Sequence, residues 1–151
     1  MSYRTREWPK TLMFKSIAEL QSGLPLPEVK KHITQEYINM YAKASRDFNP
    51  IHINEEFAKK TAAGGTIAHG MLNLAYVSQM MTSAFGRNWL ENGRFNIRFK
   101  MPARPGDDLT IQGKIEKIVP DNSTTVVTCS VSCINQKGET VINGEAIVRL
   151  N

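Results

Sequence analysis

Residues 61–86 read TAAGGTIAHGMLNLAYVSQMMTSAFG and contain no Asp, Glu, Lys or Arg. After the break at Gly64-Gly65, apolar residues recur at spacings of three and four as far as Phe85. This spacing predicts a helix, and because apolar residues also occupy its other faces, we expect it to be enclosed on nearly all sides. Gly86 is a natural stop for this helix. A membrane span is a poor alternative, because polar residues and glycines interrupt the apolar run.

The chain after this helix is patterned as β-strands. Between residues 94 and 101 apolar and polar residues alternate, which predicts a half-buried strand. Further strands are predicted over residues 109–119, 124–135 and 140–150, with turns between them. One enclosed helix followed by long strands predicts an α+β fold in which an antiparallel sheet wraps around the helix. Such a sheet has open edges, so we expect edge pairing into a homodimer.

The part of the chain before residue 61 is predicted to be mixed. A short strand is expected over residues 28–33. Thr34 is a good N-cap for a helix reaching about Ala44, and Asn54 caps a shorter helix over residues 55–60. Residues 1–25 are interpreted as an N-terminal arm without the apolar stretch of a secretory signal. With 151 residues and no internal repeat, the chain is predicted to be one domain, residues 1–151.

The composition is ordinary for a globular protein, with 41% hydrophobic and 22% charged residues. The net charge of +5 does not predict a nucleic-acid partner, because no run of Lys and Arg is interleaved with aromatic residues. Cys129 and Cys133 lie on one predicted strand with Cα atoms roughly 13 Å apart, too far for a disulfide. We therefore expect reduced, buried cysteines in a cytoplasmic protein. The pair lacks the other ligands that a metal site needs.

The segment 44–52, ASRDFNPIH, places Asp47 and His52 five residues apart across Asn49-Pro50. A carboxylate with an imidazole suits proton transfer, since one group can take a proton as the other gives one. Because Pro50 cannot lie inside a helix and biases Asn49 towards an extended conformation, we expect the pair on a turn rather than in a regular element. An Asx-Pro turn with a nearby His is more often only a turn, so the residues alone leave both interpretations open.

Several motifs together resemble the MaoC-like dehydratase family, and within it the (R)-specific enoyl-CoA hydratases. They are Tyr41-Ala42, Ser45, the Asp47-x-Asn49-Pro50-x-His52 motif, residues 67–72 (IAHGML), Phe99, Pro102 and Arg104-Pro105-Gly106-Asp107. The likeness runs from about Ser16 to the C-terminus. It implies the hot-dog fold, in which an antiparallel sheet wraps around a long central helix, usually in a dimer.

The resemblance also implies a reaction and a site. Family members add water across, or remove it from, the C2–C3 bond of an acyl thioester. Asp47 and His52 would be the catalytic pair that holds one water, and Gly70 would offer its backbone N–H to the thioester oxygen. Ser78 would hydrogen-bond the catalytic carboxylate, and Asn49 is counted with Gly70 and Ser78 among the substrate-binding residues. No metal is required, because the acceptor is already activated by its carbonyl, and no cofactor is expected beyond the coenzyme A of the substrate.

Some of these residues also have a purely structural interpretation. His69 is expected to be a core histidine whose backbone shapes the helix start. Gly70 can serve close helix packing alone, and Ser78 can bond a carbonyl one turn back in its own helix. Arg46 departs from the family's pattern, in which many members have Gly before the catalytic Asp. This departure puts the local backbone shape in question.

We therefore predict (R)-specific hydration of trans-2-enoyl-CoA to (R)-3-hydroxyacyl-CoA. The reverse dehydration, on an acyl-carrier-protein thioester in fatty-acid synthesis, is a close alternative. A hot-dog thioesterase and a non-catalytic thioester-binding subunit are further alternatives. The presence of both Asp47 and His52 argues against these last two.

Overall fold

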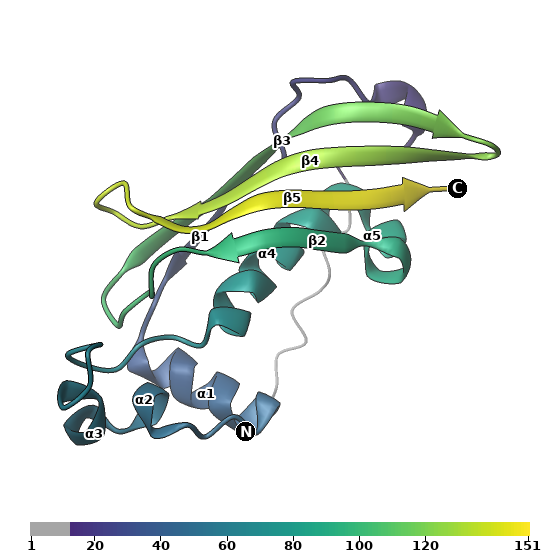
Figure 1. Cartoon of the computed structure of the whole chain (residues 1–151). Helices are drawn as coiled ribbons and strands as arrows, with labels where there is room; N and C mark the ends of the chain where they lie inside the picture. Colours follow the sequence, from purple (N-terminus) through teal and green to yellow (C-terminus); the bar gives the residue numbers. More distant parts are fainter. Residues whose placement is uncertain (1–12) are drawn as a thin grey trace.

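The computed structural model describes residues 13–151, which form a five-stranded antiparallel sheet with the helices on one side of it (Figure 1). The strands are β1 (Val29–His32), β2 (Arg94–Phe99), β3 (Asp108–Asp121), β4 (Thr124–Ile134) and β5 (Thr140–Leu150). The helices are the 3₁₀ turn η1 (Ile17–Glu19), α1 (Gln35–Ser45), α2 (Pro50–Ile53), α3 (Glu55–Lys59), α4 (Gly70–Phe85) and α5 (Arg87–Asn92). The predicted α+β class is confirmed.

The sheet has the order β1-β3-β4-β5-β2, and every neighbouring pair is antiparallel. Buried and half-buried residues alternate along the whole of β4, so one face of the sheet belongs to the core. The two hairpins turn through Asn122 and Gly138, which have φ angles of 55° and 78°. Asn and Gly tolerate this left-handed conformation better than other residues. The predicted strands are confirmed, with ends that differ by no more than two residues.

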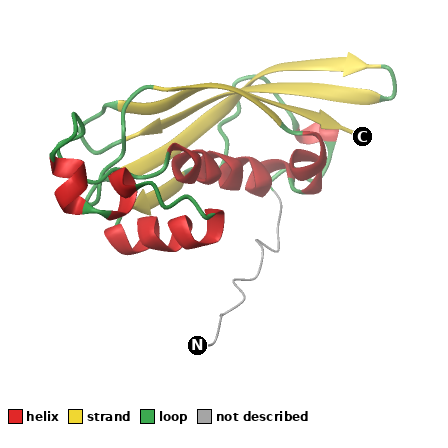
Figure 2. Cartoon of the chain, turned by 60° about the horizontal axis from the view of Figure 1, so that its bottom comes forward, coloured by secondary structure: helices red, strands yellow, loops and turns green. Residues whose placement is uncertain are grey.

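α4 is the long helix predicted from the uncharged segment, and it lies across one face of the sheet (Figures 1 and 2). It packs against β1, β3, β4 and β5, and Val77, Met80 and Met81 on this side have no exposed surface. On the opposite side Met71, at 58% exposed, is followed at spacings of four by Ala75 and Gln79, which are also exposed. The expectation of a helix enclosed on nearly all sides is therefore wrong for a single chain, because the sheet covers only one side of α4.

The three helices α1, α2 and α3 gather near the N-terminal end of α4 (Figure 1). The predicted cap of α1 is confirmed, because the Thr34 hydroxyl accepts a hydrogen bond from the backbone N–H of Tyr37. These helices bury few side chains, namely Ile38, Ala42 and Ala58. They therefore add little to the core of the domain, and polar contacts have a larger part in holding them.

The predicted N-terminal arm lies only partly within the described residues, because residues 1–12 are outside them. From residue 13 onwards the segment packs on the rest of the chain. The ring of Phe14 contacts that of Phe85, with 5.4 Å between centroids, and Leu20 is buried. The backbone N–H of Leu26 donates to the carbonyl of Gly113 in β3 at 2.8 Å. This part of the segment is therefore bound to the domain along its length.

α5 was not predicted. It follows Gly86, whose φ of 56° ends α4, and its Trp89 packs edge-on against Phe95 in β2. Six residues are too few to show helical periodicity in a sequence. The signal that could have indicated it is the Arg87 and Glu91 pair, which are four residues apart and form an ion pair.

Cys129 and Cys133 are buried and free, as predicted. Burial raises the pKa of each thiol to about 12. At pH 8 a thiol with that pKa is ionised to only about one part in ten thousand, and the thiolate is the reactive form. We expect neither cysteine to react with a disulfide reagent at pH 8 until the protein is unfolded with guanidinium. Rapid labelling of the native protein would contradict the burial of both thiols.

Candidate active site

The chain turns sharply between α1 and α2. α1 ends at Ser45, and Arg46 follows in the left-handed conformation with a φ of 60°. Glycine adopts this conformation freely, whereas other residues adopt it at a cost of about 1–2 kcal/mol. Arg46 therefore has the backbone conformation that suits a glycine.

Asp47 lies in the loop after this turn, but His52 does not lie on an irregular turn as predicted. His52 is part of the single-turn helix α2, of which Pro50 is the first residue and Asn49 the N-cap. Proline suits the first position of a helix, because its missing N–H needs no partner there. The side-chain oxygen of Asn49 accepts the backbone N–H of Ile51 at 3.1 Å. Asn49 thus has a structural role, and its contact with a substrate stays a prediction.

The structure brings the side chains of Asp47, His52 and His69 together. One carboxylate oxygen and one ring nitrogen from each histidine all lie within 4.8 Å of one another. The Asp47 carboxylate is exposed, and its Oδ1 accepts the backbone N–H of Asn49 at 3.2 Å. Nδ1 of His52 lies 2.8 Å from the carbonyl of Ile67. A carbonyl can only accept, so Nδ1 carries the proton and Nε2 of the neutral ring presents a lone pair. The cluster therefore pairs a carboxylate with an imidazole acceptor.

His69 is buried at 2% exposure, as predicted for a core histidine. Its Nε2 donates to the backbone carbonyl of Asp47 at 3.0 Å, and its ring stacks on that of His52, with 3.9 Å between centroids. Nδ1 of His69 has no hydrogen-bond partner among the residues that the structure describes, so its hydrogen-bonding capacity is not fully used there. His69 thus positions both members of the pair, one through a hydrogen bond and the other through ring contact.

Three such side chains also raise the question of a metal ion. An imidazole binds a metal along a lone pair in the plane of its ring. The rings of His52 and His69 are stacked with only 26° between their planes, so their lone pairs cannot converge on one ion. Nδ1 of His52 and Nε2 of His69 are also engaged with backbone carbonyls. The arrangement fits hydrogen bonding better than metal coordination.

Beside His52 lies a pocket of about 250 Å³ that reaches the first turn of α4. Its lining is mostly apolar and includes Gly70, Phe99 and Met101. Gly70 is the first residue of α4, where a backbone N–H has no partner within the helix. A Cβ atom on Gly70 would lie 3.2 Å from the ring of Phe99, so a side chain here would crowd the pocket. Gly70 therefore permits close packing as well as access to its own N–H.

Asn73 is a pocket residue that the sequence analysis did not single out as part of the site. It is one turn beyond Gly70 and 2% exposed, and its side-chain oxygen has no hydrogen-bond partner within residues 13–151. A buried amide without a partner is costly, which makes it notable in an otherwise apolar pocket. The signal in the sequence is a single polar residue in the uncharged segment, three residues after Gly70.

Ser78 is not brought to the carboxylate. It lies eight residues beyond Gly70, which is about 12 Å along a helix, whereas Asp47 lies near the start of α4. The Ser78 hydroxyl instead accepts the indole N–H of Trp89 at 2.9 Å. Between these described residues the expected hydrogen bond from Ser78 to Asp47 is not formed, and the structural interpretation of this serine is favoured.

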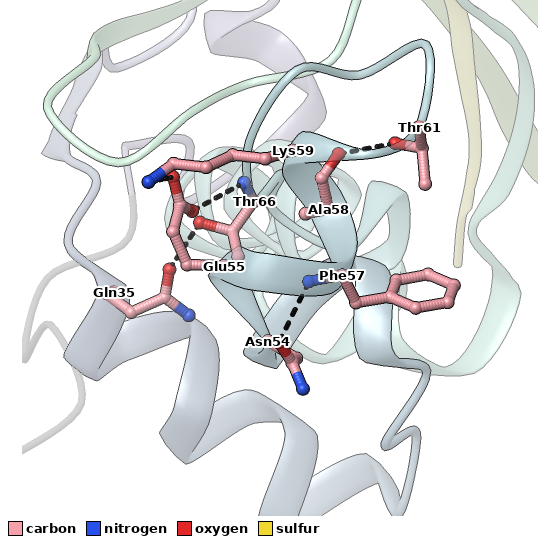
Figure 3. Close-up of polar contacts among 8 residues, drawn as sticks. All are labelled: Gln35, Asn54, Glu55, Phe57, Ala58, Lys59, Thr61 and Thr66. Carbon is pink, nitrogen blue, oxygen red and sulfur yellow. Dashed lines mark hydrogen bonds and ion pairs between the residues drawn. The ribbon is translucent and has the colours of Figure 1, made fainter.

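The loop before α4 is held in place by polar contacts with α1 and α3 (Figure 3). The backbone N–H of Thr66 donates to the carboxylate of Glu55 at 3.0 Å, and the Thr66 hydroxyl donates to Gln35 at 2.7 Å. The hydrogen bond from Thr66 holds the pKa of the Glu55 carboxyl below its usual value. Lys59 lies 3.8 Å from the same carboxylate. These contacts determine where the chain enters the site.

The sequence is similar to that of known proteins of one family. Residues 21–137 match the model of the MaoC like domain. The chain is 33% identical to the (R)-specific enoyl-CoA hydratase of Rhodospirillum rubrum over 89% of both chains. It is 31% identical to the enzyme of that name from Aeromonas caviae, over 73% of this chain and 81% of that one. This protein belongs to the MaoC-like family.

The solved structures agree with this assignment. Unliganded R-hydratase PhaJ1 from Pseudomonas aeruginosa superposes with a TM-score of 0.75 at 29% identity, covering 88% of this chain and 83% of that one. The MaoC-like chain therefore has the hot-dog fold, as the resemblance implied. No helix within residues 13–151 is long and apolar enough to cross a membrane.

The bond between Ser78 and Trp89 gives a test of the structural role of this serine. Trp89 is 5% exposed, so Ser78→Ala leaves a buried indole N–H unpaired, at a cost of about 1–3 kcal/mol. We expect urea unfolding to show this loss, while turnover stays within about twofold of wild type. Ser83→Ala is the control, because the Ser83 hydroxyl is exposed and bonds only a carbonyl of its own helix. A large loss of turnover with unchanged stability would restore Ser78 to the active site.

Proposed function

We propose that this MaoC-like protein hydrates trans-2-enoyl-CoA to (R)-3-hydroxyacyl-CoA, and that Asp47 and His52 are its catalytic pair. The observation that carries the proposal is the meeting of the Asp47 carboxylate with an imidazole whose Nδ1 is held by a carbonyl. Nε2 of His52 is thereby left as an acceptor beside the pocket. The two relatives named as (R)-specific enoyl-CoA hydratases support the substrate class and the stereochemistry.

The reaction makes three demands on the site. Water must lose a proton as its oxygen bonds to C3, C2 must receive a proton, and the negative charge that develops on the thioester oxygen must be stabilised. Asp47 and His52, close together and both reachable from solvent, can hold one water and divide the two proton transfers. The net change is one C–O bond and one C–H bond formed, while the C2–C3 π bond and one O–H bond of the water are broken.

The third demand falls to the start of α4. The N–H of Gly70 has no partner within its helix, and the dipole of a 16-residue helix favours negative charge at this end. A donor of this kind is most effective where charge develops in the transition state. The thioester oxygen placed at Gly70 would lie in the same pocket as His52, so C3 and the water can meet within it. The proposed reaction uses no cofactor and no metal.

The alternatives differ in product rather than in fold. Dehydration of an acyl-carrier-protein thioester would run the same chemistry in reverse on another carrier. A thioesterase would cleave the bond to sulfur, and a binding subunit would leave the substrate intact. Incubation with crotonyl-CoA separates these outcomes: hydration removes the enoyl absorbance without releasing thiol, a thioesterase releases thiol, and a binding subunit does neither. Comparing the hydration rate of crotonyl-CoA with that of the crotonyl thioester of an acyl carrier protein then shows which carrier the enzyme prefers.

The catalytic pair can be tested by substitution. We expect Asp47→Asn and His52→Ala each to lower kcat by at least about a hundredfold, because each removes a proton-transfer group. The double variant should be little worse than either single one, since the residues act as a unit. The structure offers a matched control in His32 and Asp108, an exposed pair joined at 2.7 Å on β1 and β3. His32→Ala and Asp108→Asn should keep normal turnover, and normal turnover in His52→Ala would refute the assignment.

We also propose that the protein is a homodimer joined through β2. Among residues 13–151 this strand lies at one edge of the sheet and pairs only with β5, so one side of its backbone is open within that part of the chain. Large apolar side chains are exposed beside this edge, with Phe99 at 52%, Met101 at 43% and Met71 at 58%. Phe99 and Met101 line the pocket, so an interface here would cover its mouth. The active sites would then lie near the interface.

Sedimentation at micromolar concentration should give twice the chain mass of 17.0 kDa. Phe99→Lys should weaken the dimer, because it places a charge in the proposed apolar interface. Val119→Lys is the control, since Val119 is equally exposed, at 51%, but lies on β3. A 17.0 kDa species for the wild-type chain, or equal dissociation of both variants, would contradict an interface at β2.

A cytoplasmic location is part of the same proposal. Cys129 and Cys133 are free thiols, which suits a reducing compartment.

A further inference from the structure

Gln35 has a set of hydrogen bonds that the proposed reaction does not account for. It is the first residue of α1 and half-buried. Its Nε2 donates to the backbone carbonyl of His52 at 2.7 Å and to the side chain of Asn39 at 2.9 Å. Its Oε1 accepts the hydroxyl of Thr66 at 2.7 Å, as Figure 3 shows. Both amide hydrogens and the oxygen are therefore engaged, and the side chain is held in one orientation.

Two of the three partners of Gln35 belong to the two segments that hold the imidazole of His52. One partner is the backbone of His52 itself. The other is Thr66, whose neighbour Ile67 provides the carbonyl that accepts the Nδ1–H of the same ring. The segments also meet directly, because the N–H of Ile67 donates to the carbonyl of Ile51 at 3.3 Å. The contacts thus form a closed ring. It runs from Gln35 to the backbone and imidazole of His52, from the imidazole to the carbonyl of Ile67, and through the adjacent Thr66 back to Gln35.

We propose that Gln35 is a positioning residue that sets the direction of Nε2 of His52 by fixing the distance between these two segments. This inference rests on the proposed function, in which Nε2 handles a proton. Gln35 itself does not line the pocket beside His52 and need not touch the substrate. A carboxamide suits the role because it donates and accepts at once, and a carboxylate of the same length cannot donate.

The short helix α2 cannot hold His52 in place by packing. α2 has only four residues and buries none of them, so packing alone does not hold His52. Hydrogen bonds therefore act together with the stacking on His69 to determine the position of the ring. Displacing a catalytic group by about 1 Å can cost about a hundredfold in rate.

The test compares Gln35→Glu, which keeps an acceptor for Thr66 but loses the donor to His52, with a control on the same helix. We expect Gln35→Glu to lower kcat by about ten- to a hundredfold while KM changes less than about threefold. The control Thr34→Val removes the α1 cap, which bonds Tyr37 and not the site. It should lower the melting temperature and leave kcat within about twofold.

Thr66 allows a test of the other link, between Gln35 and the loop before α4. Thr66→Ser keeps the hydroxyl and should retain wild-type turnover, whereas Thr66→Val removes it and should lose turnover as Gln35→Glu does. The double variant Gln35→Glu with Thr66→Val should be little worse than either alone, because each breaks one link of the same connection between the two segments. Additive losses, or equal losses in Thr66→Ser and Thr66→Val, would overturn the proposal.

A readout that does not depend on turnover is the proton on Nδ1 of His52. In ¹⁵N-histidine-labelled protein, the His52 signal is identified by its loss in His52→Ala. We expect Gln35→Glu to shift this signal and to speed exchange of the Nδ1 proton with water, while Thr34→Val leaves both unchanged. An unchanged His52 signal in Gln35→Glu would overturn the positioning role. If wild-type protein fails to hydrate crotonyl-CoA, the proposed function falls, whereas the imidazole signal still decides whether Gln35 holds His52.

Discussion

The packing of α4 against the sheet is the constraint on which the rest of the structure depends. The apolar side of this helix supplies completely buried residues such as Val77, Met80 and Met81, and burial of this kind is the dominant favourable term in folding. The same packing fixes where α4 begins. The N–H of Ala68 donates to the carbonyl of Ala103 at 2.8 Å, and Gly70 lies against Phe99. The free N–H groups at the helix start are thereby held at one edge of the sheet, next to a pocket.

The α1–α3 region is organised by a different kind of interaction. It buries few side chains, and its position relative to α4 depends on reciprocal contacts between two histidines and two backbone carbonyls. His52 donates to the carbonyl of Ile67, just before α4, while His69 donates to the carbonyl of Asp47, just before α2. The two rings stack between these bonds. Each segment therefore holds the other, and the carboxylate and imidazole come together because of it.

The two parts of the site are held by different kinds of contact. The part of the site on α4 belongs to a helix that packs in the core, whereas the part that carries Asp47 and His52 rests on exposed or half-buried polar contacts. Regions with few buried apolar contacts open more easily than the core does. A pocket of about 250 Å³ whose mouth is flanked by exposed Phe99 and Met101 also suits completion by a second chain.

Much of the fold was predictable because its signals are local. The uncharged run of residues 61–86 indicated α4, alternation indicated the strands, and the caps Thr34 and Asn54 indicated α1 and α3. Two local predictions failed for local reasons: α5 is too short for periodicity, and Pro50 begins a helix instead of preventing one. The prediction that α4 is enclosed on nearly all sides was wrong for another reason. Periodicity shows which faces of a helix are apolar, but not how much of them one sheet can cover.

For the site, the residues that could take part are evident along the chain, namely Asp47, His52, His69 and a glycine at the helix start. Which of them meet depends on the folding of the whole chain. It placed Ser78 with Trp89, turned His69 from a core residue into a partner of both Asp47 and His52, and brought Gln35 to the backbone of His52 from seventeen residues away. Side chains that are distant in sequence meet only when helices have definite lengths and packing angles, and those depend on contacts along the whole chain.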